Sequence, residues 1–162
     1  MGVVFKVNLE MKKDVQNASF PCVALDKGTA WNMVEKIDLA PINRKLMLEN
    51  SVLWTVESVA LAENLYRRFL VLHAVFPSED LVPTKVLDGY WHQHILDTKK
   101  YAQDCEFLFG EFLHHDPYFG INGEDDRLMN QKAFAWTQSL WESVFGEALL
   151  GEANPCKSTD CR

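Results

Sequence analysis

The stretch YWHQHILDTKKYAQDC, which begins at Tyr90, gathers side chains that bind metals or move protons. It contains two of the chain's five histidines, His92 and His94, and Asp88 stands four positions before His92. Another histidine, His115, follows in the tripeptide HHD. Imidazole nitrogens combined with a carboxylate oxygen suit iron, copper or zinc. The sequence therefore indicates a candidate metal site with four candidate ligands: Asp88, His92, His94 and His115.

Helix geometry limits which of these residues share one ion. On a regular helix, residues two apart point roughly 200° away from each other, so His92 and His94 meet one ion only if the helix unwinds there. Asp97 resembles the N-cap of a new helix that starts at Thr98, which predicts such a break. Asp88 and His92 share a face in any case. Two histidines and a carboxylate would suit ferrous iron and oxygen chemistry, whereas three histidines would suit copper or catalytic zinc.

Two further residues are the nearest candidates for proton transfer or substrate contact. Tyr101 and Cys105 follow His94 on the same face if the helix continues past Asp97. A tyrosine beside a metal can donate a proton, and a cysteine is a ligand or nucleophile when its pKa is lowered. We therefore take Tyr101 and Cys105 as the candidate catalytic residues.

Every one of these residues also has a purely structural interpretation. His92 would be a surface histidine bonded to Asp88, and His94 a core histidine bonded to a backbone carbonyl. Tyr101 would be a core tyrosine, and Cys105 an inert buried thiol. The hypothesis of a site depends on their clustering, because four of the five histidines fall within residues 92–115. The fifth, His73, follows an apolar helix face and is predicted to be a core histidine with satisfied polar atoms.

The elements that must position these residues are mainly helical. An alternation of apolar and polar residues over 5–12 predicts a strand, and FPCVAL at 20–25 predicts a second one. From Thr29 onward the period is helical. Helices are predicted to about 37, from Pro41, from a cap at residue 50 or 51 to about 76, from a cap at Thr84 to 96, from 98 to 109 or 113, and from a cap at 125 or 126 to Gly151.

These elements predict a mainly α fold, a compact helical bundle of five or six helices with a small N-terminal strand pair. The strand pair would occupy residues 1–28 and pack on the bundle. The helical domain would span 29–151, and residues 152–162 would form a mobile tail. At 162 residues the chain is long enough for one domain with a real core.

Composition narrows the classes of partner. The net charge is −7, and no basic patch stands out, which argues against nucleic acid as a partner. The longest apolar run, FLVLHAVF, is too short to cross a bilayer, so no membrane partner is expected. The four cysteines form no C-x-x-C pair, which indicates a reducing cytoplasm. A homodimer is left open.

The segment LVPTKVLDGYWHQHILDTKKYAQDC, with GEFLHHD after it, resembles the glycine-rich domain-containing protein-like family. The family pattern has P-[ST], then [VI]-D-x-x-W-H-x-H, a Tyr and a later H-D. This chain has Thr98 where many members have proline, and it lacks a glycine-rich tail, so it is similar to a stand-alone core domain. The resemblance implies that the histidines act as a set, without defining a reaction. The pattern falls on Pro83, Thr84, Asp88, Trp91, His92, His94, Tyr101, His115 and Asp116.

The leading hypothesis for function is a metal-dependent enzyme with non-haem iron or copper, ahead of zinc. It would perform an oxidative tailoring step on a small molecule or peptide in a biosynthetic pathway. Its ligands would be His92, His94 and His115, with Asp88 as a ligand or as a residue that orients one. The alternative is a non-catalytic helical interaction module with a structural zinc or a buried His/Asp network. A metal-free Cys/His enzyme ranks third.

Overall fold

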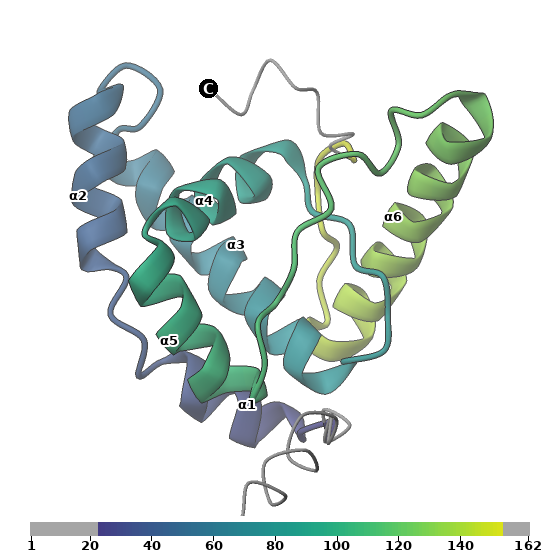
Figure 1. The fold of residues 1–162 in the computed structure, drawn as a ribbon, viewed down its shortest axis with the longest axis horizontal. Helices are drawn as coiled ribbons and strands as arrows, with labels where there is room; N and C mark the ends of the chain where they lie inside the picture. The colour runs from purple at the N-terminus through teal and green to yellow at the C-terminus, as the bar shows by residue number, and fades with distance from the viewer. Residues whose placement is uncertain (1–22, 154–162) are drawn as a thin grey trace, which may run out of the picture.

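The computed structural model describes residues 23–153, which form a bundle of helices (Figure 1). The mainly α prediction is confirmed. Within residues 23–153 there is no strand, only an isolated bridge between Thr84 and Ala153. The predicted strand pair lies almost wholly outside the described residues, and so does most of the predicted tail. The six helices are α1 (Lys27–Val34), α2 (Ala40–Glu49), α3 (Val56–Val75), α4 (Lys85–Leu96), α5 (Thr98–Phe109) and α6 (Glu124–Phe145).

Helix α3 is the centre of the bundle. It contacts α1, α2, α4 and α6, and α5 packs on α4 and α1. The sequence from Phe69 to Leu72 is apolar without interruption, and these four residues are almost completely buried. A helix that is apolar around most of its circumference must be surrounded by other elements. No helix in the described part of the chain is long and apolar enough to cross a membrane.

Helix α3 starts later than the sequence predicts. Its N-cap is Thr55, whose hydroxyl accepts a hydrogen bond from the Ser58 amide at 3.2 Å. The predicted cap, Asn50, instead ends α2, and its side chain accepts from the Leu53 amide in the following turn. Val52, which would lie inside the helix if it began at residue 50 or 51, is 91% exposed. Several polar residues here can cap a helix, and the periodicity alone does not choose among them.

Helices α4 and α5 follow the predicted boundaries closely. Thr84 caps α4, as predicted, by accepting from the Leu87 amide. Asp97 separates the two helices, but its side chain makes no capping hydrogen bond. Helix α5 ends before Gly110, which adopts a left-handed conformation with φ of 69°, instead of continuing to Leu113. Glycine favours this ending because it adopts positive φ without a steric penalty.

Helix α6 differs from the prediction at both ends. It begins at Glu124 after Gly123, and neither predicted aspartate is its cap. Asp126 instead accepts hydrogen bonds from the backbone amides of Gly120 at 2.7 Å and Asn122 at 3.0 Å, so it holds the preceding loop. The helix ends before Gly146, not at Gly151.

Two long connections run beside the bundle and frame the site. In Figure 1 the segment between α5 and α6, in green, passes in front of the bundle toward α6. The segment between α3 and α4 is tied to α6, because the Val82 amide donates to the Thr137 hydroxyl at 2.9 Å. That hydroxyl donates in turn to the Ala133 carbonyl at 2.9 Å. The site therefore lies where helices and well-anchored loops meet.

Candidate metal centre

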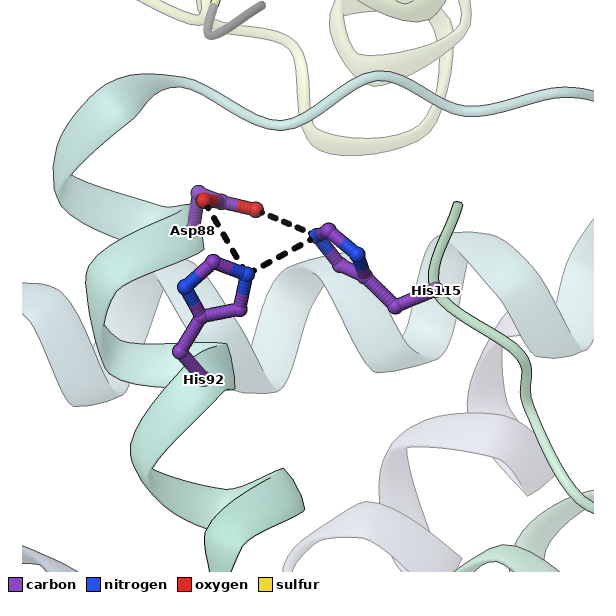
Figure 2. A group of neighbouring side chains, drawn as sticks. All are labelled: Asp88, His92 and His115. Atoms are coloured by element: carbon purple, nitrogen blue, oxygen red, sulfur yellow. Dashed lines mark hydrogen bonds and ion pairs between the residues drawn. The ribbon is translucent and has the colours of Figure 1, made fainter. Parts of the chain in front are cut away.

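Three side chains converge in one place, and we call them the metal cluster: Asp88, His92 and His115 (Figure 2). Asp88 and His92 lie one turn apart on α4, on the shared face that their spacing predicts. His115 approaches from the opposite side on the segment that follows α5. One ligand atom from each residue lies within 4.8 Å of both others. The structure thus brings together three of the four predicted ligands.

The separations within the metal cluster match those of ligands on one ion. The two Nε2 atoms of His92 and His115 are 3.1 Å apart. The Nε2 atom of His115 is 2.9 Å from Oδ1 of Asp88, and that of His92 is 3.5 Å from Oδ2. Two nitrogen ligands of a tetrahedral zinc ion, at a metal–nitrogen distance of roughly 2.0–2.1 Å, lie about 3.3 Å apart. The side chains are therefore spaced for a shared first-row transition metal.

Burial makes a cation favourable in this place. The Asp88 side chain is 4% exposed, and the two imidazoles are partly buried. A buried carboxylate is costly unless an opposite charge or hydrogen bonds compensate it. A bound metal ion would compensate the Asp88 carboxylate by coordinating it. In a metal-free state, the imidazoles would compensate the carboxylate by donating hydrogen bonds to it, since a neutral ring carries one N–H.

A chain of contacts holds His115 in position. The Tyr101 hydroxyl donates to the Leu113 carbonyl at 2.6 Å and accepts from Nε1 of Trp91 at 2.9 Å. The Trp91 ring packs edge-on against His115, with 4.7 Å between ring centroids. Tyr101 and Trp91 therefore tie the segment that carries His115 to α4 and α5. Residues that orient ligands in this way usually affect metal affinity strongly.

His94 does not join the metal cluster. Helix α4 stays regular through Leu96, so His94 points away from His92 and into the core, where it is 1% exposed. Its Nδ1 lies 2.8 Å from the Tyr66 hydroxyl, and its Nε2 lies 2.9 Å from Oδ2 of Asp104. The unwinding that a shared ion would require is absent from this helix. The structural interpretation of His94 fits better, with side-chain partners in place of the expected carbonyl.

Asp104 and Tyr66 are partners of His94 that the sequence did not predict. Burial raises the pKa of Asp104, but hydrogen bonds from His94 and Lys100 outweigh it, and the net pKa is lowered. The Lys100 ammonium lies 2.8 Å from the same carboxylate. The spacing of Lys100 and Asp104, four apart, could have indicated this pair. No local signal points to Tyr66, because it lies 28 residues from His94.

The two candidate catalytic residues, Tyr101 and Cys105, lie in the core and outside the metal cluster. Tyr101 and Cys105 are both buried, at 1% and 2% exposure. Burial raises the pKa of the Tyr101 hydroxyl well above its usual value, and burial also raises the pKa of the Cys105 thiol. Both groups therefore keep their protons at neutral pH, and neither lines the pocket described next. In the structure, Tyr101 anchors the segment that carries His115 through its hydrogen bond to the Leu113 carbonyl.

A pocket of about 370 Å³ opens beside the metal cluster, and Asp88 and His115 form part of its wall. The volume falls within the roughly 300–1,000 Å³ that is typical of small-molecule sites. His73 also lies in the wall. Burial lowers its pKa to about 3, so the ring is neutral at physiological pH. Its Nε2 is buried and has no hydrogen-bond partner within the described residues, so the prediction of a fully satisfied core histidine is wrong for this atom.

Comparison with known proteins identifies one family to which the chain is similar. A family model described as UCP032817-like matches residues 31–142, which include all three residues of the metal cluster. That description names no activity, ligand or partner. No curated protein and no solved structure matches the chain significantly. The resemblance to glycine-rich domain-containing proteins is not tested by these matches and stays a prediction.

Proposed function

The chain belongs to the UCP032817-like family, and we propose that it is a metal-dependent enzyme in which Asp88, His92 and His115 hold one ferrous ion. The observation that carries the proposal is the convergence of these ligand atoms beside a pocket. Two histidines and one carboxylate with open coordination positions are typical of non-haem iron sites for oxygen chemistry. The same set also suits catalytic zinc, and copper would favour nitrogen ligands.

The number of ligands supports catalysis over structure. Structural zinc sites are closed by four protein ligands, usually with several cysteines. Among the described residues the metal cluster has three members and no thiolate. A three-ligand ion keeps positions for water or substrate, and the pocket supplies room for the latter. We propose a small molecule or a peptide side chain as the substrate, in an oxidative tailoring step of biosynthesis in the cytoplasm.

A second candidate function has its own support. The Asp88–His115 contact at 2.9 Å and the His92–His115 contact at 3.1 Å are also within hydrogen-bond range. The cluster would then be a buried polar network, or hold a structural zinc, in a non-catalytic interaction module. Such networks can favour a unique fold without any reaction.

Metal titration of tag-free protein tests the proposal. We expect one Fe²⁺ or Co²⁺ per chain by calorimetry and elemental analysis. His92→Ala and His115→Ala should weaken binding by more than about 100-fold, because losing even an outer residue commonly costs 10–100-fold. His114→Ala is the matched control, since this neighbouring histidine lies outside the metal cluster and should leave affinity unchanged. An equal loss in the control, or no stoichiometric binding, would refute the metal site.

Added azide separates the catalytic site from the structural one. If the bound ion has open positions, azide should change the visible spectrum of the Co²⁺-loaded protein. A closed, structural site should give an unchanged spectrum, which would favour the interaction module.

A further inference from the structure

The pocket beside the metal cluster has a distinct chemical character. Its wall combines apolar and aromatic side chains with polar ones, and it is built by α3, the segment before α4, α4 itself, the segment after α5 and α6. The apolar part of the wall suits a ring or a branched hydrocarbon. The apolar side chains that form it include Leu81, Val82, Trp91, Leu113 and Phe119.

Three acidic residues also line the pocket, and we call them the acidic rim: Glu79, Asp80 and Asp116. All three are exposed, which places them toward solvent, whereas Asp88 of the metal cluster is buried. The Glu79 carboxylate is held in place by Nε1 of Trp136 on α6, at 2.7 Å. The rim thus presents negative charge at the opening.

No lysine or arginine is among the described residues that line this pocket. Sites for carboxylates and phosphates normally use these cations, because they offer charge-assisted hydrogen bonds. In the metal-free protein, an anionic ligand would therefore meet like charge at the rim, and no lysine or arginine of the pocket would compensate it. A ligand that carries a positive charge at one end would instead be attracted to the rim.

The buried Nε2 of His73 is a second feature that points to a ligand. A buried polar atom without a hydrogen bond costs free energy, and such atoms are rare in folded proteins. His73 belongs to the pocket wall, and its ring and that of His115 both lie beside the Trp91 indole. A bound molecule with a polar group at this depth would offer the missing partner.

We propose that this pocket binds a small molecule with an apolar body and a protonated amine. The amine would lie at the acidic rim, and the body would extend inward toward His73 and the metal cluster. This orientation keeps the ammonium away from the bound cation, which would repel it. As the substrate class, this inference rests on the function proposed above, but binding to the pocket itself does not require a metal.

Three probes of similar shape test the inference: 2-phenylethylamine, 2-phenylethanol and 3-phenylpropanoate. Ligand-observed NMR titrations would use the metal-free and the Zn²⁺-loaded protein. In the metal-free protein we expect the amine to bind roughly three- to tenfold more tightly than the alcohol, given the modest strength of exposed charge pairs, and the carboxylate to bind most weakly. The preference for the amine should shrink as salt is added.

Variants identify the source of the preference. Glu79→Gln/Asp80→Asn should reduce affinity for the amine and leave affinity for the alcohol unchanged. Gln at position 79 retains an oxygen that can accept from Trp136. The control Glu106→Gln/Glu142→Gln removes the same charge from exposed positions that do not line the pocket, and it should change neither affinity.

The outcomes distinguish this inference from the proposed function. Equal or tighter binding of the carboxylate to the metal-free protein, or equal effects of the two double variants, would overturn the preference for an amine. A protein that binds Co²⁺ but none of the probes would refute the pocket inference and leave the metal site standing. If the protein binds the amine probe but no metal, the proposed metal-dependent function is refuted and the inference about the pocket stands.

Discussion

At the scale of single residues, the two histidines of the W-H-x-H motif do different things. His92 lies in the metal cluster, and His94 is buried between Tyr66 and Asp104. Their separation by two positions explains this, because a regular helix turns them to opposite sides. The motif therefore combines a position in the metal cluster with a position in the core.

Stability measurements should separate these roles. His94→Ala leaves the buried Tyr66 hydroxyl and the Asp104 carboxylate without this partner, so we expect a loss of about 2–3 kcal/mol in the free energy of unfolding. His92→Ala, on a partly exposed ring, should cost less than about 1 kcal/mol in metal-free protein. Urea denaturation followed by circular dichroism measures both. If the two variants are equally destabilised, the division of roles is wrong.

At the scale of elements, the site depends on where α5 stops. Gly110 ends the helix and releases an extended segment, which returns along α5 and α4 and brings His115 to Asp88. The Tyr101 hydroxyl fixes this path through the Leu113 carbonyl. One helix thus supplies two members of the metal cluster, and a tethered loop supplies the third.

Tyr101→Phe tests the tether. The variant keeps the ring in the core but removes the hydroxyl, and the Trp91 indole loses its acceptor. We expect metal affinity to fall by about tenfold, as for other residues that orient ligands. Stability should fall by roughly 1 kcal/mol. Tyr90→Phe, which loses a hydroxyl bonded to Asn43, is a control for stability that should leave metal affinity unchanged. An unchanged metal affinity in Tyr101→Phe would show that Tyr101 only packs.

At the scale of the whole molecule, the core does not depend on the metal cluster. Helix α3 is enclosed by four other helices, and most of the largest buried side chains come from elements other than α4 and the segment that carries His115. The Arg67 guanidinium adds a tie by donating to the carbonyls of Val34 and Ile37 at the end of α1. The metal-free chain should therefore stay folded.

Chelation tests this independence. Removing the metal should leave the far-ultraviolet circular dichroism unchanged and lower the melting temperature. At metal concentrations of 100 times Kd, binding adds about 2.7 kcal/mol to the free energy of unfolding, so the melting temperature should fall by several degrees. Loss of helical signal on chelation would favour the structural zinc of the second candidate function.

The sequence by itself determined the helices and the local pairs. The 3.6-residue period predicted α4 and α5 closely, and the four-residue spacing predicted that Asp88 and His92 share a face. It did not decide the cap of α3 or the start of α6, because several nearby polar residues suit those positions. Its predictions were correct where one local interaction dominates.

Only the tertiary structure decided which histidines meet. His115 reaches the metal cluster because a loop folds back across two helices, and His94 leaves it because Tyr66 and Asp104 are packed against it. These contacts span 27, 28 and 10 residues, so no periodic pattern encodes them. They arise from the packing of α4 against α3 and α5, where burial forces each polar group to find a partner.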